Sequence, residues 1–314
     1  GIAVVSEIEE ALQFRDIQAA VVSTQARTHF DVARRCLEAG KHVLVEKPMV
    51  TTTDCARSLV ELAEKNGLVL MVGHIFLYNP GITMIKSYID TKQAGDIYYL
   101  YTRRTNLGPV RHDVNALWDL ASHDVAILNF LLNQRPEWVS AVGSRVLHNC
   151  REDVGFVVLH YPNNVLGHIH VSWAEPNKVR ELVVVGSEKR IVFNDLDSQE
   201  RVRIFDKGIT ALYADSEPSS YGEYHFSIRD GDIVSPHIEV SEPLKNQCNH
   251  FIDCVIDHKR PISDGQSGLV VVHIMEAACQ SLEVNGVPVY LDWNRTDHPT
   301  ERMSEANHAY SIHS

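Results

Sequence analysis

A lysine at the end of a predicted buried strand is the first residue whose position suggests chemistry. Lys47 follows the apolar run 42–45 and Glu46, and it precedes Pro48. Such a run predicts a strand of a parallel sheet, and the strand must end at Lys47 because proline has no N–H to donate. Ligands bind at the carboxyl ends of strands in open α/β sheets, where an ammonium can donate to a substrate hydroxyl. Taken alone, a Lys-Pro pair is more often only a solvated strand end.

An aspartate and a histidine form the second candidate group. Asp119 and His123 lie four positions apart in a predicted helix over 115–132, which places them on one face. A carboxylate in this position orients an imidazole and raises its basicity, as a general base requires. The alternative is a solvated pair that only stabilises the helix. Because the rest of this helix is apolar, we expect its polar residues to face a cleft.

These two features suit one reaction. A lysine at a strand end and an Asp/His pair on a later helix can together remove the proton of a secondary alcohol while a hydride leaves its carbon. This reaction requires the side chains of Lys47 and His123 to face one shared cavity.

The elements that would position these residues belong to two different patterns. Residues 1–73 alternate apolar strands (19–23, 42–47, 68–72) with helices (28–39, 53–66), which predicts βαβ units and a parallel sheet.

After residue 73 the pattern changes to a long strand (96–105), the helix 115–132 and a series of strands as far as residue 206. We therefore expect an α/β protein with an incomplete Rossmann-type parallel sheet over 1–73. A second α+β domain over 74–291 holds a large, open, mostly antiparallel sheet. The Ser/Asp/Gly/Pro-rich segment 214–242 predicts a loop, and 292–314 a polar tail. The outer face of the open sheet needs cover, which favours a homodimer or homotetramer.

Composition excludes several classes of function. The 314 residues carry 29 Lys and Arg against 41 Asp and Glu, a net charge of −12, and no basic patch interrupts the acidic balance. Nucleic-acid binding is therefore not expected. No apolar run has the roughly 20 residues that span a bilayer, and six unpatterned cysteines fit reduced thiols, so we expect a cytoplasmic protein with no membrane contact. His168 and His170 share a strand face but have no third ligand in the sequence, so no metal site is predicted.

Several motifs together resemble the Gfo/Idh/MocA family of nicotinamide-dependent oxidoreductases. The resemblance spans nearly all of 19–291. The stretch 106–109 with Trp118-Asp119-Leu120 is most similar to the branch that oxidises the 3-hydroxyl of UDP-linked N-acetylamino sugars. The motifs are Val21-Val22-Ser23-Thr24 with His29, Glu46-Lys47-Pro48, Val72-Gly73-His74 with Tyr78-Asn79-Pro80, Asp119-x-x-x-His123, and the late run from Pro243-Leu244 to Gly268-Leu269.

The resemblance implies a role for each matching position. Lys47 hydrogen-bonds the reacting hydroxyl, His123 is the acid/base, and Asp119 supports it. The Lys47–Pro48 peptide is expected to be cis. The cofactor is NAD or NADP, and the substrate is a sugar or sugar nucleotide. Expected cofactor contacts are Ser23, Thr24, His29, Glu46, Lys47 and Asn79, and expected substrate contacts are Asn106, Arg111 and Asp113.

One departure from the family is important. The sequence contains no G-x-G-x-x-G turn, the feature that seats the cofactor pyrophosphate on a helix N-terminus. We therefore expect an N-terminally truncated chain whose activity is in doubt, with an unpaired edge on the strand at 19–23. Two alternatives remain: a non-catalytic regulator that binds sugar or dinucleotide, and a structural partner of a complete paralogue.

Overall fold

The computed structural model describes residues 4–111, 113–147, 150–211, 226–239 and 241–293. Its helices are α1 (Ile8–Leu12), α2 (His29–Glu38), α3 (Thr53–Lys65), α4 (Pro80–Asp90), α5 (Ser122–Leu132), α6 (Pro243–Asp257) and α7 (Gly265–Glu283). A π-helical turn, Leu117–Ala121, leads directly into α5.

The strands are β1 (Ala19–Val22), β2 (His42–Val45), β3 (Leu70–Val72), β4 (Ile97–Leu107), β5 (Trp138–Ser144), β6 (Val154–Tyr161), β7 (Val165–Ser172), β8 (Ala174–Gly186), β9 (Arg190–Asn194), β10 (Val202–Phe205), β11 (Gly208–Ala211), β12 (Phe226–Arg229), β13 (Ile233–Val234) and β14 (Val289–Tyr290).

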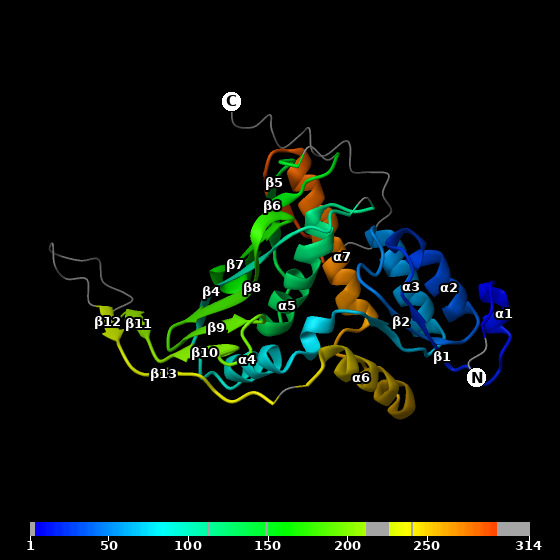
Figure 1. Cartoon of the computed structure of the whole chain (residues 1–314), viewed down its shortest axis with the longest axis horizontal. Helices are drawn as coiled ribbons and strands as arrows, with labels where there is room; N and C mark the ends of the chain where they lie inside the picture. Colours follow the sequence, from blue (N-terminus) through cyan, green and yellow to red (C-terminus); the bar gives the residue numbers. More distant parts are fainter. Residues whose placement is uncertain (1–3, 112, 148–149, 212–225, 240, 294–314) are drawn as a thin grey trace.

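The first sheet is parallel, in the order β1-β2-β3. Its middle strand β2 is apolar and buried, with Val43, Leu44 and Val45 at most 2% exposed. Helices α2 and α3 lie beside this sheet, in the blue part of Figure 1. In the described part of the chain β1 is an edge strand, and Val21 is 62% exposed there. The expected unpaired edge at this strand is therefore present in the described residues.

The second sheet has nine strands in the order β13-β10-β9-β8-β4-β7-β6-β5-β14. Only the central β4–β7 pairing is parallel, and every other pairing in this sheet is antiparallel. The expected fold class is confirmed: a small parallel sheet and a large, mostly antiparallel one. The turn over 162–164 connects β6 to β7 as the sequence predicts.

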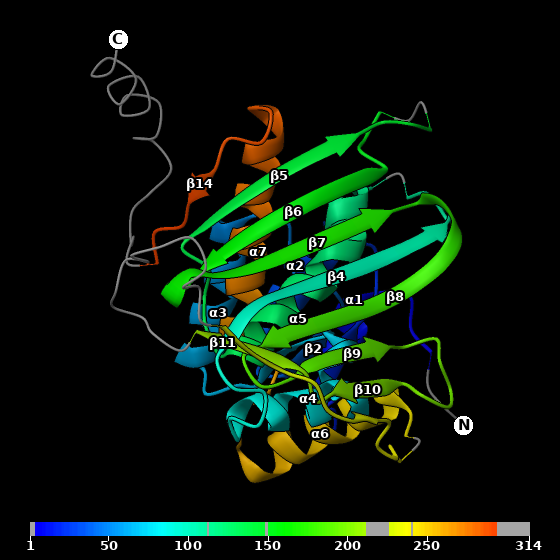
Figure 2. The ribbon, with the colours of Figure 1, turned by 90° about the vertical axis from the view of Figure 1, so that its left-hand side faces the viewer.

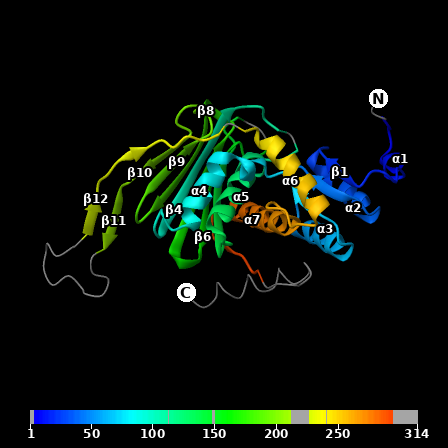
Figure 3. The same cartoon turned by 90° about the horizontal axis from the view of Figure 1, so that it is seen from below.

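Helices fill the space between the two sheets. Helices α4, α5 and α7 contact one face of the large sheet, and α7 also contacts α3 and β3 (Figures 1 and 3). Figure 2 shows the opposite face, across which the strands run with no described helix in front of them. The catalytic candidates lie on the side of the large sheet that the helices cover.

Two sequence expectations differ from the structure. Strands β12 and β13 lie inside the segment expected to be a loop, and the predicted tail lies outside the described residues from 294 onward. The predicted helix over 115–132 is π-helical at its start, so it is not one regular α-helix.

Candidate active site

The carboxyl ends of the three parallel strands form the base of the site. Lys47 follows β2, His74 follows β3, and Ser23 and Thr24 follow β1. Because parallel strands end at one edge of their sheet, these side chains come from one rim. Gly73 leaves room for the Glu46 side chain at this rim, since a Cβ there would lie 2.9 Å from Oε2 of Glu46 and would displace it.

Lys47 connects this rim to Asp119, in the part of the chain that contains the large sheet. Its Nζ donates to the backbone oxygen of Asp119 at 2.7 Å and to Oδ1 of Asp119 at 3.1 Å. The two side chains are only 15% and 16% exposed. Burial lowers the pKa of the Lys47 ammonium, and the Asp119 carboxylate opposes this shift. The Lys47–Pro48 peptide is cis, as expected.

The Asp119 carboxylate is held by three donors from different elements. Besides Lys47, Nη1 of Arg111 donates to Oδ1 at 3.2 Å, and the indole Nε1 of Trp173 donates to Oδ2 at 3.2 Å. None of these donors is His123. The sequence suggested a hydrogen-bonded Asp119–His123 pair, and no such bond is present between these described residues. The π-helical turn ends at Ala121, so the phase of the helix changes between the two positions.

The charge of Lys47 nevertheless acts on the His123 imidazole. Burial lowers the pKa of His123 well below its usual value, and the charges of Lys47 and Arg104 lower it further. Its Nδ1 is buried without a hydrogen-bond partner among the described residues, and its ring packs edge-on against Phe76, with centroids 5.0 Å apart. These effects favour the uncharged form of the imidazole, in which one ring nitrogen has a lone pair.

A buried ion pair fixes the helix that carries His123. Nε and Nη2 of Arg104 donate to the two carboxylate oxygens of Asp124 at 2.9 and 2.8 Å, and both side chains are under 10% exposed. The Arg104 guanidinium also lies 4.1 Å from the centroid of Phe76. A bidentate pair of this kind sets the orientation of α5 against β4.

Three expected cofactor contacts have other partners in the structure. His29 is 1% exposed, and its two ring nitrogens contact the carbonyl oxygens of Pro48 (2.8 Å) and Thr24 (3.0 Å). Asn79 is 2% exposed and caps α4 while donating to Asp195. His29 and Asn79 are therefore buried and hydrogen-bonded within the chain, and the cofactor contacts expected of them remain predictions. The Oε2 of Glu46 accepts from the backbone N–H of Lys47 at 3.3 Å, and its side chain stays partly exposed.

Of the expected substrate residues, Arg111 contacts Asp119 directly, with Nη1 donating to Oδ1 at 3.2 Å. Arg111 donates to both oxygens of Asp113, and Nδ2 of Asn106 donates to the carbonyl of Gly108. Arg111 thus reaches the same carboxylate as Lys47. Trp173, Phe76 and Arg104 were not singled out from the sequence as parts of the site. They lie far from Lys47 in the chain, and no local motif marks them.

The polar groups at this rim fit the nicotinamide-ribose half of a dinucleotide. Ser23 and Thr24 are exposed hydroxyls, and the Glu46 carboxylate lies beside them on the next strand end. Hydroxyl and carboxylate groups hydrogen-bond ribose hydroxyls and a carboxamide. Among the described residues no group of three His, Cys, Asp or Glu side chains is arranged to hold a metal ion. No described helix has the length and apolar character needed to cross a membrane.

The structure combines a parallel sheet that has a lysine at its carboxyl rim with a helical segment, packed against a large mixed sheet, that carries Asp119 and His123. This combination is typical of two-part nicotinamide-dependent dehydrogenases. Family models agree: residues 1–74 match the oxidoreductase family with an NAD-binding Rossmann fold, and residues 82–192 match the GFO/IDH/MocA C-terminal domain. The chain belongs to the Gfo/Idh/MocA family of NAD-binding oxidoreductases.

The chain is similar to dehydrogenases of known name. It is 26% identical over 299 residues to scyllo-inositol 2-dehydrogenase (NAD(+)) of Bacillus subtilis, covering 91% of this chain and 81% of the relative. It is 24% identical over 256 residues to UDP-N-acetylglucosamine 3-dehydrogenase of Acidithiobacillus ferrooxidans, covering 81% and 75%. The crystal structure of GenD2 from gentamicin A biosynthesis, in complex with NAD, matches the fold with a TM-score of 0.75, at 24% identity, over 92% of this chain and 83% of GenD2.

Proposed function

We propose that this chain oxidises a secondary hydroxyl of a sugar, a sugar nucleotide or a cyclic polyol, with NAD or NADP as hydride acceptor. The observation that supports the proposal is a buried ammonium, Lys47, whose charge acts on a buried imidazole, His123; burial and then this charge lower the pKa of His123. Relatives that act on inositol and on UDP-N-acetylglucosamine support the substrate class.

The proposed role of Lys47 follows from its free donor. An ammonium has three N–H donors, and two are used on Asp119. The third is left for the oxygen of the reacting alcohol. The charges of Lys47 and Arg104 favour the negative charge that develops on that oxygen as its proton leaves.

The proposed role of His123 is to take the proton. With its own proton on Nδ1, the ring offers the Nε2 lone pair to the hydroxyl, so the O–H bond breaks as the N–H bond forms. Positioned base catalysis of this kind typically contributes roughly 10²–10⁴-fold. A bound nicotinamide cofactor would supply the hydride acceptor for the same carbon. Ser23, Thr24 and Glu46 would hold its ribose and carboxamide.

Asp119 has a different role from the one its spacing suggested. Its carboxylate accepts from Lys47, Arg111 and Trp173, so it orients the ammonium rather than the imidazole. Arg111 is proposed to contact an anionic group of the substrate, because it keeps 32% of its side chain exposed beside the same carboxylate.

The direct test is turnover. Purified chain is mixed with NAD or NADP and with scyllo-inositol, myo-inositol, UDP-N-acetylglucosamine or its uronic acid, and reduced nicotinamide is followed by absorbance. We expect formation of reduced cofactor with at least one of these, abolished in Lys47→Met and His123→Gln and kept in the surface control Lys65→Met. Equal rates in Lys47→Met and wild type would overturn the assignment. Absence of turnover in a chain shown by calorimetry to bind NADH would favour a non-catalytic binding protein.

Assembly through the open face of the large sheet remains a proposal. Tyr99, Phe156 and Leu166 are each at least 40% exposed on adjacent strands of that sheet. Contiguous exposed apolar residues of this kind mark interfaces between copies. Light scattering of wild type and of Phe156→Lys checks it: the variant is expected to have the lower mass, and an unchanged mass contradicts this interface.

A further inference from the structure

A second cavity extends from His74, at the catalytic rim, along α5 away from His123. Its volume is about 670 Å³, and it is bounded by α4, by the second half of α5 and by the first turns of α7. His123 is in the first turn of α5, whereas Asn133, in the cavity wall, follows the last turn. These positions are separated by about 15 Å along the helix axis. The volume suits a small organic molecule.

The charge of the cavity wall is opposite to that of the protein. Lys86, Arg135 and Arg260 line it, and Asp264 is the only carboxylate among the described lining residues. Asp264 is already used, because it accepts from Nε of Arg260 and from the backbone N–H of Ser267. Lys86 also pairs with a carboxylate, that of Asp90, so Arg135 is the lining cation that has no carboxylate partner among the described residues.

The same wall holds polar atoms without partners. Nδ1 of His74, Nδ2 of Asn129 and Oε1 of Gln134 are buried and have no hydrogen-bond partner among the described residues. His74 is only 3% exposed. Buried polar groups are nearly always paired in native structures, so three in one wall mark a place where a polar partner is missing.

The rest of the wall is apolar. Leu77, Ala126, Phe130 and Val270 contribute side chains between the charged ones. A ligand that fits this wall therefore combines an anionic group with an apolar body. A fully hydroxylated sugar would leave this apolar surface without a matching partner.

We propose that this cavity is a second binding site, distinct from the catalytic one, for a small organic acid whose carboxylate pairs with Arg135 and whose apolar body packs on Phe130 and α7. The unpaired Nδ2 of Asn129 can donate to the carboxylate, and Gln134 can donate to it through Nε2 once its amide turns over. The inner end of the site is His74, which follows β3 one strand away from Lys47.

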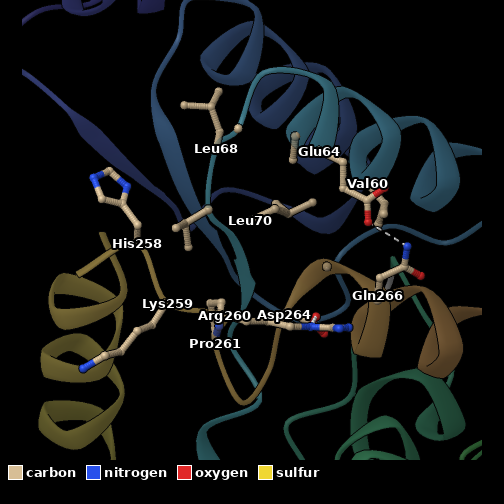
Figure 4. Close-up of a pocket in the computed structure, with 14 residues that line it drawn as sticks. Val60, Glu64, Leu68, Leu70, His258, Lys259, Arg260, Pro261, Asp264 and Gln266 are labelled. Carbon is tan, nitrogen blue, oxygen red and sulfur yellow. Dashed lines mark hydrogen bonds and ion pairs between the residues drawn. The ribbon is translucent and has the colours of Figure 1, made fainter. Parts of the chain in front are cut away.

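A smaller neighbouring cavity differs from the proposed site in its lining. Figure 4 shows this smaller cavity, of about 320 Å³, whose wall also includes Arg260, Asp264 and Gln266. There the Nε2 of Gln266 donates to Glu64 at 2.9 Å. The unpaired atoms listed above do not line it, so the proposed ligand belongs to the larger cavity.

The test uses the full chain and benzoate as the probe, with benzyl alcohol as its uncharged counterpart. Calorimetry or ligand-observed NMR is expected to show saturable binding of one benzoate per chain, at least ten times tighter than benzyl alcohol. Arg135→Gln is expected to weaken benzoate at least fivefold. Arg34→Gln, an arginine on the surface of α2, is the matched control and is expected to leave binding unchanged. Circular dichroism and unfolding temperature show that each variant is folded.

Three results would overturn the proposal. They are absence of saturable benzoate binding, equal binding by Arg135→Gln and wild type, and loss of binding in Lys47→Met with retention in Arg135→Gln. The last result would place benzoate at the catalytic rim. None of these outcomes bears on turnover, so this site and the proposed reaction succeed or fail separately.

Discussion

Replacing Asp119 by asparagine tests the role that the structure gives this carboxylate. The change keeps the shape of the side chain and the backbone oxygen that accepts from Lys47 at 2.7 Å. It removes the charge that receives Lys47 at 3.1 Å, Arg111 at 3.2 Å and Trp173 at 3.2 Å. The Asp119 carboxylate raises the pKa of Lys47 and so opposes the effect of burial. In the variant, Lys47 therefore loses its proton more easily.

The size of the effect follows from the bonds lost. A hydrogen bond to a charged group contributes about 1.5–3 kcal/mol, and each 1.36 kcal/mol is tenfold in rate. If Lys47 acts on the alcohol, kcat/KM falls roughly 10- to 150-fold. The pKa that Lys47 contributes to the pH profile moves down.

The assay is the initial rate of cofactor reduction from pH 6 to pH 10. Asp113→Asn is the matched control, because Asp113 also binds Arg111 but has no bond to Lys47. The control is expected to lose much less. If Asp119→Asn keeps the wild-type rate and pH profile, Asp119 does not act through Lys47 and this part of the reasoning is wrong.

Three further changes test the supports of the site. Asp124→Leu leaves the buried Arg104 guanidinium unpaired and is expected to lower the free energy of unfolding, measured by urea titration, by about 3–5 kcal/mol. Most of this loss is expected to be recovered in the Arg104→Leu/Asp124→Leu double variant, and additive losses from the two changes would contradict the prediction. Burial lowers the pKa of His74 to about 4, below the value of about 6.5 in an unfolded chain, so the unfolded state binds the proton first as the pH falls. His74 therefore costs stability between about pH 6.5 and pH 4, approaching about 3 kcal/mol, and His74→Gln is expected to abolish this part of the acid sensitivity; parallel pH dependence of the two proteins would refute it. His29→Leu removes contacts to the carbonyls of Pro48 and Thr24 and is expected to cost about 2 kcal/mol and to reduce kcat/KM, whereas an unchanged unfolding curve would show that the bridge is not important.

The parallel sheet could be predicted from the sequence because its signals are local. The run Val43-Leu44-Val45 is buried on both faces and is bounded by Gly40 and Pro48. Gly40 has a φ of +72°, the left-handed conformation that ends helix α2. Lys47 at the strand end follows from the same local pattern.

The partners in the site could not be predicted, because they are set by tertiary contacts. A spacing of four residues put Asp119 beside His123 on a regular α-helix, but the helix is π-helical there, and donors from other elements occupy the carboxylate. Trp173 is 54 residues from Asp119 in the chain. No short motif contains that distance.

The exposure of His29 was also beyond sequence reasoning. A polar residue at a strand-to-helix corner fits a ligand contact and a backbone bridge equally well. Only the structure shows that the Pro48 carbonyl lies 2.8 Å from the ring.

The protonation state of His123 is the most direct test of the central claim, that an uncharged imidazole stands ready beside a charged lysine. It is measured by ¹⁵N NMR of histidine-labelled protein, with the signal assigned by its absence in His123→Gln. We expect a neutral ring near pH 6, where a free histidine with a pKa of about 6.5 is mostly charged, and a higher pKa in Lys47→Met. An imidazolium signal near pH 6 in the wild type, or a pKa that ignores the loss of Lys47, would contradict the account.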